Sequence, residues 1–345
     1  MPKKKSSQTA KSSPPAPAIA LTGTAGFVGS QLLKALEEDP RYSKIIAIDY
    51  RKPPFETKKT KFYRFDLTET LADAKLLEIF EKENVDTVIH AAFPVSPPRD
   101  LTWAHELVSV GTMYVLDACA AKKIRKLISV STTELYGAYP TNPNFLSEKH
   151  ALRGGFKSKF LRDRVDADNQ VISFAKKHPE TVVTLLRPCT ILGPNVNHYK
   201  TDFLQRIVIV TVLGYDPLFQ CIHEDDVTRA FKLAIEKDFP GTFNLVGDGV
   251  LPLSRVLHLS GKLSVPLPGP LLYPVVNLLW ALDIINAPGS RLDFLKYLCV
   301  ADGEKAKKIM GFQPKYSTKE TLLSFIGAQR LKQAHLDDLR LVVNR

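Results

Sequence analysis

The chain has 345 residues, of which 44% are hydrophobic and 24% are charged, and its formal net charge is +11. This composition is typical of a globular protein with one large or two modest domains, and a chain of this length buries a sizeable core without disulfide or metal staples. The four cysteines lie far apart and form no CxxC or Cys/His pair, which argues against a disulfide framework or a zinc site. They are Cys119, Cys189, Cys221 and Cys299.

The positive charge does not select one class of partner. The first 17 residues hold four lysines and no acid, and a basic balance suits anionic small molecules as well as nucleic acids or an anionic membrane. No zinc-finger spacing and no repeat of aromatic and basic residues indicates nucleic-acid binding, so no such partner is expected. No apolar stretch has the length of a membrane span or of a signal-peptide core, so a cytoplasmic location is expected.

Strands and helices are predicted to alternate along most of the chain. Residues 1–17 are mainly Lys, Ser and Pro, which predicts a disordered basic tail. Short apolar runs and amphipathic segments then follow one another. Strands are predicted at 18–22, 45–49, 61–66, 85–91, 126–131, 182–187 and 241–247, and helices at 27–38, 72–83, 101–122, 158–177 and 223–235.

This alternation predicts an α/β fold: a Rossmann-type doubly wound parallel sheet with a smaller C-terminal substrate-side domain. The regular rhythm ends after Pro188. We therefore assign residues 18–190 to the Rossmann domain, with 215–250 returning to it, and residues 191–214 and 251–345 to the substrate-side domain. The strongly apolar segment 271–285 is expected to be a buried helix; contact with a membrane surface or an apolar substrate pocket is the alternative.

A glycine-rich turn with the spacing GxxGxxG lies between the first strand and the first helix, formed by Gly23, Gly26 and Gly29. In such a turn the first glycine permits a tight bend, the second lets the backbone approach a pyrophosphate, and the third lets the helix pack on the strand. The backbone N–H groups of Phe27 and Val28 are then placed to bind phosphate at the positive end of the helix dipole. The turn therefore predicts a dinucleotide-binding site.

An acid at the end of the second strand fits the same site. Asp49 follows Gly29 by twenty residues. A carboxylate there accepts hydrogen bonds from both ribose hydroxyls and repels a 2′-phosphate, so NAD is expected in preference to NADP. Arg51 follows closely and tolerates that phosphate, which keeps NADP as an alternative.

The ends of the third and fourth strands complete the predicted cofactor site. Asp66 and Leu67 are placed to receive the adenine amino group, although Asp66 is equally explained as an acid at a helix start. Ala91 and Ala92 are small and let the cofactor pass over the sheet edge. We interpret His90 as a packed histidine rather than a catalytic one.

These motifs resemble the extended short-chain dehydrogenase/reductases, the NAD-dependent epimerase/dehydratase group, over about residues 18–326. The resemblance is carried by several segments besides the glycine turn and Asp49. They are TGTAGFVG (22–29), FDL (65–67), HAA (90–92), SVSTTELYG (129–137), LLRPCTILGP (185–194), IHEDDV (222–227), GTFNLVGDG (241–249) and KAKKIMGFQP (305–314).

The resemblance implies a set of four active-site positions. In that family a tyrosine is the general acid/base, and a lysine four residues later holds the nicotinamide ribose. A serine or threonine binds the reacting oxygen, and an asparagine on the preceding helix supports the site. The corresponding positions here, in the order Asn, Thr, Tyr and Lys, read Val108, Thr132, Phe160 and Arg164. The resemblance also implies that Arg164 and Pro188 contact the cofactor.

Two of these residues cannot perform the usual chemistry. Phe160 has no proton to exchange, and the pKa of Arg164 is too high for proton transfer. Losing a positioned acid/base typically costs about 10² to 10⁴ in rate. Tyr136, Tyr139 and Glu134 are candidates to replace it, and each is also explained as a structural residue.

Two functions remain open at this point, besides the further hypothesis of a lipid-linked or apolar substrate met at a membrane, which the apolar segment 271–285 suggests. The first is an NAD(P)-binding oxidoreductase, epimerase/dehydratase-like, that acts by an atypical mechanism on a nucleotide sugar or a similar hydroxyl or carbonyl metabolite. The second is a catalytically inactive dinucleotide-binding sensor or scaffold. The family resemblance further suggests a homodimer formed through the helices at 101–122 and 158–177.

Overall fold

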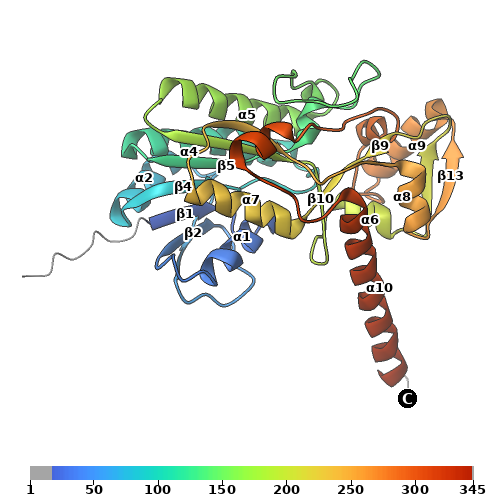
Figure 1. Cartoon of the computed structure of the whole chain (residues 1–345), viewed down its shortest axis with the longest axis horizontal. Helices are drawn as coiled ribbons and strands as arrows, with labels where there is room; N and C mark the ends of the chain where they lie inside the picture. Colours follow the sequence, from blue (N-terminus) through green and yellow to red (C-terminus); the bar gives the residue numbers. More distant parts are fainter. Residues whose placement is uncertain (1–17, 344–345) are drawn as a thin grey trace, which may run out of the picture.

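The computed structural model describes residues 18–343, with side chains as far as residue 334. The predicted tail at 1–17 lies outside the described residues. A parallel sheet of seven strands forms the centre of the protein, in the order β11-β6-β5-β4-β1-β2-β3 (Figure 1). Its strands are β1 (Ala18–Thr22), β2 (Ile45–Asp49), β3 (Thr60–Arg64), β4 (Val85–His90), β5 (Lys126–Val130), β6 (Val182–Pro188) and β11 (Gly241–Leu245).

Helices cover both faces of this sheet because successive strand residues point to opposite sides. Ile19 and Leu21 belong to the core under α1 and α7, whereas Ala20 belongs to the core under α2, α4 and α5. Figure 1 shows these two helical layers on opposite sides of the sheet. The helices are α1 (Phe27–Glu37), α7 (Glu224–Glu236), α2 (Ala72–Lys82), α4 (Gly111–Lys122) and α5 (Lys159–Lys177). The predicted Rossmann-type α/β fold is confirmed.

Each predicted strand and helix of this unit is present, with ends that differ by no more than two residues. One difference lies inside the helix predicted at 101–122. It consists of α3 (Leu101–His105), a π-helical turn η1 (Glu106–Val110) and α4 in direct succession. Such an extra residue in a turn shifts the helix face by one position, which hydrophobic spacing alone does not reveal.

The strand order places the candidate site residues at one edge of the sheet. All seven strands are parallel, and β1 lies between β2 and β4. The strands β2 and β3 are therefore added on one side of β1, and β4, β5, β6 and β11 on the other. Ligands of open α/β sheets bind at this point, beyond the carboxyl ends of the strands. Backbone hydrogen bonds join the ends: Gly23 N donates to Ile48 O at 3.0 Å, and Ala91 N donates to Thr22 O at 3.2 Å.

The chain beyond β6 also forms three two-stranded sheets and further helices. The predicted division into 18–190 with 215–250, and 191–214 with 251–345, stays a prediction. The sheets pair β7 (Thr190–Leu192) with β10 (Cys221–His223), β8 (Val208–Val212) with β13 (Leu263–Leu267), and β9 (Leu218–Phe219) with β12 (Leu251–Pro252). The helices are α6 (Tyr199–Gln205), α8 (Leu253–Leu259), α9 (Gly269–Ala281) and α10 (Thr318–Val343). Of these elements, α8, α9 and β13 lie at the end of the molecule opposite to α2 (Figure 1).

The expectation of a buried helix at 271–285 is wrong. In α9 only Leu272 is buried, and it packs with Val212 and Leu292, while Leu271 and Leu278 are exposed. The helix is apolar all round, so its sequence indicated burial on every side, but the fold packs it on one side only. Within the described residues 18–343, no helix combines the length and the apolarity needed to cross a bilayer.

This packing predicts opposite effects for two leucines of the same helix. Leu272→Ala is expected to lower the free energy of unfolding by about 2–4 kcal/mol, because it leaves a cavity beside Val212. Leu278→Ala is expected to change it by less than about 0.5 kcal/mol, because the side chain is exposed. Urea unfolding of both variants measures the difference, and equal losses would contradict the one-sided packing of α9.

Candidate cofactor and substrate site

The glycine turn brings the start of α1 into backbone contact with the sheet edge. Gly23 has a φ of +76°, and Gly26 N donates to Gly23 O at 3.1 Å. A Cβ atom on Gly23 would lie 2.5 Å from the backbone of Ala91, and a Cβ on Gly29 would lie 2.1 Å from the carbonyl oxygen of Gly23. Side chains at these two positions are therefore excluded, as the predicted turn requires.

The first turn of α1 offers unpaired backbone donors. Gly26 is the N-cap residue in an extended conformation, and no side chain caps the helix. The N–H groups of Phe27 and Val28 lie in the first turn, where an α-helix supplies no acceptor. Gly26, Phe27 and Val28 line a cavity of about 100 Å³ at the sheet edge. This cradle fits the pyrophosphate of a dinucleotide.

Two backbone hydrogen bonds hold the Asp49 carboxylate beside the glycine turn. Its Oδ2 accepts a hydrogen bond from Ala25 N at 2.8 Å, and its Oδ1 accepts one from Arg51 N at 3.1 Å. The carboxylate is buried at the end of β2. The guanidinium of Arg51 lies 4.8 Å from the centre of the Tyr50 ring, at the surface. The Asp49 carboxylate is thus beside the turn, and the cofactor contacts predicted for Asp49 and Arg51 stay predictions.

The residues that end β3 and β4 are engaged in local contacts. Asp66 Oδ1 accepts from Thr68 N at 2.9 Å and from its hydroxyl at 2.8 Å, and Leu67 is buried. The adenine contacts predicted for both residues stay a prediction. His90 is hydrogen-bonded to Thr22 and Thr112 on its two ring nitrogens, and burial lowers its pKa to about 3. This is the packed histidine that we inferred.

The structure brings three of the four predicted active-site positions to the cavity at the start of α1. Thr132, Phe160, Arg164 and Pro188 line it together with Ala91 and the start of α1. Ala92 is buried directly after Ala91. Val108 is buried in η1 and is absent from the lining.

Arg164 is held inside the protein. Its Nη1 donates to Pro94 O at 3.2 Å, and its guanidinium lies 5.1 Å from the centre of the Phe93 ring and 5.9 Å from that of Phe160. Burial lowers the pKa of Arg164. The group nevertheless stays a cation at neutral pH and can hold an anionic or hydroxyl-bearing ligand.

The two tyrosines considered as replacement catalysts are structural. The Tyr136 hydroxyl donates to Asn244 Oδ1 at 2.8 Å and accepts from Arg187 Nη1 at 3.1 Å, deep in the core. The Tyr139 hydroxyl donates to Arg153 O at 2.9 Å. Neither residue lines the cavity.

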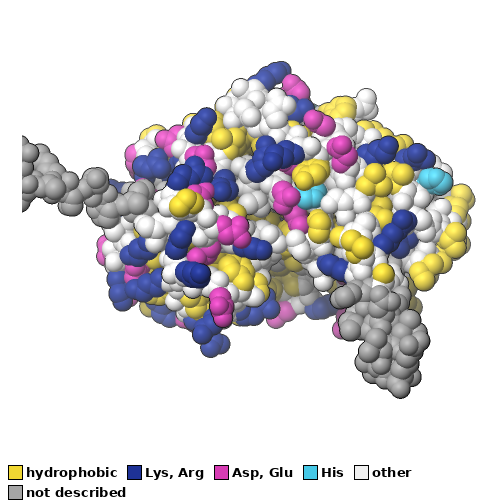
Figure 2. All heavy atoms as spheres, turned by 60° about the horizontal axis from the view of Figure 1, so that its bottom comes forward, with side chains coloured by type: hydrophobic (Ala, Val, Ile, Leu, Met, Phe, Trp, Pro, Cys, Tyr) yellow, Lys and Arg dark blue, Asp and Glu magenta, His cyan; other side chains and the backbone are white. Residues whose placement is uncertain are grey.

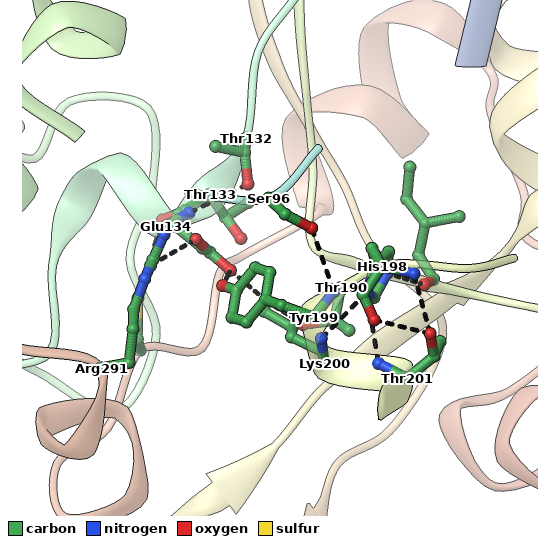
Figure 3. A network of polar contacts seen from close by, with 12 residues as sticks. Ser96, Thr132, Thr133, Glu134, Thr190, His198, Tyr199, Lys200, Thr201 and Arg291 are labelled. Atoms are coloured by element: carbon green, nitrogen blue, oxygen red, sulfur yellow. Dashed lines mark hydrogen bonds and ion pairs between the residues drawn. The ribbon is translucent and has the colours of Figure 1, made fainter. Parts of the chain in front are cut away.

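A different tyrosine reaches the cavity, in a buried ionic network around Glu134 (Figure 3). The Tyr199 hydroxyl donates to Glu134 Oε1 at 2.9 Å, and Lys200 forms an ion pair with the same oxygen. Arg291 Nη1 pairs with Glu134 Oε2 at 2.7 Å. Among the described residues, no group of three His, Cys, Asp or Glu side chains has the arrangement of a metal site.

Local backbone contacts place this network. The hydroxyl of Thr132 accepts from Glu134 N at 3.3 Å at the start of η2 (Thr133–Tyr136). The ring of His198 caps α6 by accepting from the N–H groups of Lys200 and Thr201, which orients Tyr199 and Lys200. Arg291 comes from η4 (Gly289–Leu295).

Sequence reasoning missed Tyr199, Lys200 and Arg291. Tyr199 follows the GP pair at 193–194 by five residues, and this is the signal that could have marked it. No sequence pattern marks Arg291, because it meets Glu134 only through tertiary contact across 157 positions.

Opposing effects act on the Glu134 carboxyl. Burial by itself would raise its pKa, but Lys200 and Arg291 outweigh this effect, so the pKa lies well below its usual value. Glu134 is therefore ionised at neutral pH. Proton uptake by this carboxylate is disfavoured, and its role is to orient Tyr199 and the two cations.

The network forms a wall between two cavities. Glu134, Tyr199 and Lys200 line the small cofactor cavity, and they also line a larger one of about 380 Å³. The larger cavity extends between α6, β8, β9, α9 and η4, and a volume of this size is typical of a small-ligand site. Tyr199 therefore faces both cavities.

Comparison with known proteins identifies the family. The model of the NAD dependent epimerase/dehydratase family matches residues 19–245, and the chain belongs to this family. An uncharacterized protein of Mycobacterium tuberculosis is 29% identical over 327 residues, covering 91% of this chain and 84% of that protein. A vestitone reductase of Medicago sativa is 22% identical and covers 88% of this chain and 93% of its own length.

Solved structures share the fold. A UDP-glucose 4-epimerase of Thermotoga maritima, solved with UDP-glucose, has a TM-score of 0.70 at 20% identity and covers 92% of this chain and 99% of its own. A dTDP-glucose 4,6-dehydratase of Streptomyces venezuelae, solved with NAD, has a TM-score of 0.72 at 17% identity and covers 92% and 98%. At such identities the likeness establishes the fold alone.

The Glu134 network predicts a pH-dependent contribution to stability. Because the folded-state pKa lies below the ordinary value of 4.5, the contribution is present above that pH and is lost as the pH falls further. Glu134→Gln leaves buried cations without their partner and is expected to cost about 3–5 kcal/mol at pH 7. Urea unfolding at pH 7 and pH 4 tests this, since the gap between variant and wild type should narrow at pH 4. A gap independent of pH would contradict the ion pairing.

Proposed function

We propose that the protein is an NAD-linked oxidoreductase that acts on a hydroxyl or carbonyl group of a small molecule by an atypical mechanism. One observation carries this proposal: Thr132, Arg164 and Tyr199 line the cavity that begins at the first turn of α1. NAD, when bound there, accepts or returns the hydride. The family to which the chain belongs supports NAD as the cofactor.

Residues at the sheet edge would hold the cofactor. The amides of Phe27 and Val28 bind the pyrophosphate, and Asp49 binds the adenosine ribose through an oxygen close to Ala25 N. Arg164 meets the nicotinamide ribose as a cation. NAD is preferred because Asp49 repels a 2′-phosphate, and Arg51 keeps NADP as the second choice.

Tyr199 is proposed to replace the missing catalytic tyrosine. Burial raises its pKa well above the usual value, so the hydroxyl is protonated at neutral pH. In the direction of carbonyl reduction, Thr132 would donate a hydrogen bond to the reacting oxygen. The Tyr199 O–H would turn from Glu134 Oε1 to that oxygen and give it the proton. Arg291 and Arg164 would stabilise the phenolate until it takes a proton back from water. Phe160 then serves as an apolar wall behind both groups.

Relatives suggest the class of substrate. Proteins similar to this chain are named as enzymes of UDP- or dTDP-linked glucose, and others as reductases such as vestitone reductase. A nucleotide sugar or a similar hydroxyl or carbonyl metabolite is thus the proposed substrate. A homodimer in the cytoplasm remains part of the proposal.

A second candidate function has its own support. Phe160 stands where the family has its catalytic tyrosine, and Val108 stands where it has asparagine. A dinucleotide-binding sensor or scaffold without turnover would retain the glycine turn and tolerate both changes.

Cofactor preference tests the role of Asp49. Wild type is expected to bind NADH at least about tenfold more tightly than NADPH, and Asp49→Ser to abolish this preference, since one charge-assisted pair contributes about 1.5–3 kcal/mol. Fluorescence titration with both dinucleotides measures it. Gly29→Val serves as the control that binds neither, because its side chain would meet the oxygen of Gly23. Equal binding of NADH and NADPH by wild type would contradict the assignment.

Turnover tests the role of Tyr199. With NADH and a panel of UDP-glucose, dTDP-glucose and 2-decanone, Tyr199→Phe is expected to lower the rate by about 10²- to 10⁴-fold without changing NADH affinity. Phe160→Tyr combined with Arg164→Lys restores the family residues and is expected to raise the rate. NADH binding without turnover in wild type and in the restored variant would favour the sensor.

A further inference from the structure

The wall of the larger cavity is mainly apolar. Its charged residues are those of the Glu134 network at one end, together with Asp202 and the exposed Arg206. Gln220, Asn286 and Asp202 already have partners. Gln220 exchanges two hydrogen bonds of 3.0 Å with the backbone of Ala301. Asn286 donates to Asp202 at 3.0 Å. A nucleoside diphosphate brings charged phosphates, ribose hydroxyls and a base, all of which need polar partners when buried. The cavity instead suits a hydrocarbon body.

One polar side chain in the wall awaits a partner. Arg291 is only 8% exposed, yet its Nε and Nη2 atoms have no hydrogen-bond acceptor, while Nη1 is used by Glu134. Buried donors without acceptors are rare in folded proteins. A carbonyl or carboxylate oxygen of a ligand in the cavity would satisfy them. The polar end of that ligand would then lie beside Tyr199, whose ring centre is 5.0 Å from the guanidinium.

The cavity reaches an exposed apolar face. We define the apolar face by the exposed side chains of Ile207, Val208, Leu263, Val265, Leu271 and Leu278, on β8, β13 and α9 and next to them. Val208, Leu267 and Val275 are exposed and also line the cavity, so the cavity wall and the surface share residues. Figure 2 shows hydrophobic side chains gathered at the end of the molecule where Figure 1 places α8, α9 and β13.

The charge around the apolar face indicates what it meets. The segments 203–215 and 254–282 contain Arg206, Arg255 and Lys262 and no Asp or Glu. The acids that adjoin these segments are engaged: Asp202 with Asn286, Asp216 with Ser254 and Asp283 with Arg99. Basic residues around an apolar surface complement an anionic lipid surface. A symmetric contact with a second copy would bring the same cations together, which is unfavourable.

We propose that the larger cavity holds the apolar body of an amphiphile, with its carbonyl or carboxylate oxygen at Arg291. The apolar face docks on an anionic lipid surface from which the amphiphile enters. This inference rests on the proposed function for the reaction, and among the substrates proposed there it selects an apolar carbonyl or hydroxyl compound in place of a nucleotide sugar. The binding and the docking stand independently of turnover.

Vesicle flotation of the full chain tests the docking. Wild type is expected to float with vesicles of equal parts phosphatidylcholine and phosphatidylglycerol and to float less with phosphatidylcholine alone. Leu271→Asp with Leu278→Asp is expected to reduce flotation about tenfold or more, since it places two charges in the apolar face. The side chains replaced are 68% and 60% exposed.

The matched control replaces two equally exposed apolar residues elsewhere. Leu71 is 64% and Ile309 is 56% exposed, next to α2 and in η5 (Ala306–Met310). Leu71→Asp with Ile309→Asp is expected to float as wild type does. The basic residues 1–17 are present in every variant, so the difference between the pairs measures the apolar face. The docking would be overturned if wild type stayed at the bottom of the gradient. It would also be overturned if Leu271→Asp with Leu278→Asp changed only the oligomeric state, from dimer to monomer, and left flotation unchanged.

Fluorescence of cis-parinaric acid tests the cavity. The probe is expected to bind wild type and to lose about tenfold or more in affinity in Val276→Trp, which fills the cavity from α9. Retained NADH binding would verify that Val276→Trp is folded. If Val276→Trp does not fold, Leu279→Phe, which also narrows the cavity from α9, takes its place. Displacement of the probe by UDP-glucose, or failure of wild type to bind it, would overturn the inference. NADH binding without turnover would overturn the proposed function and leave the probe result unaffected.

Discussion

The buried charge of Glu134 is the constraint on which the candidate site depends. Its carboxylate lies in η2, directly after β5, and can stay ionised in the interior only because Lys200 and Arg291 reach it. A buried carboxylate without partners would be strongly unfavourable, so the fold must bring α6 and η4 against the end of the central sheet. The same contacts hold Tyr199 over the cofactor cavity and separate it from the larger one.

The two cavities beside this network differ in chemistry. The smaller one is bounded by backbone amides at the start of α1 and by Arg164, which suits an anionic dinucleotide. The larger one is bounded mainly by aliphatic and aromatic side chains and has cations at one end. In the function that we propose, a hydride acceptor and an apolar substrate would meet at Tyr199, each in its own environment. Tyr199 thus borders the cavity that Arg164 lines on one side and the larger, mainly apolar cavity on the other.

The position predicted to correspond to the family's catalytic tyrosine is apolar in this chain. Phe160 is buried against Leu135 and Leu161, so its ring fills the place without offering a proton. Tyr199 approaches the same cavity from α6, 39 residues after Phe160 and on a different element. The geometry retains a hydroxyl at the cofactor cavity even though the pattern Tyr-x-x-x-Lys is absent. The chain thus has a tyrosine hydroxyl at the smaller cavity without having the pattern Tyr-x-x-x-Lys in α5.

The sequence by itself determined the Rossmann-type unit, the glycine turn and the place of Asp49. These follow from local rules: apolar runs form buried strands, helical spacing forms the covering helices, and Gly23 and Gly29 stand where a Cβ atom would collide with backbone. It also brought Thr132, Phe160 and Arg164 to one site, because parallel strands end at one edge. Only the tertiary structure decided that Tyr199 and Arg291 join Glu134, and that α9 is exposed rather than buried. The reason is that pairing across many residues, and burial of a helix that is apolar all round, depend on which surfaces the rest of the chain leaves free.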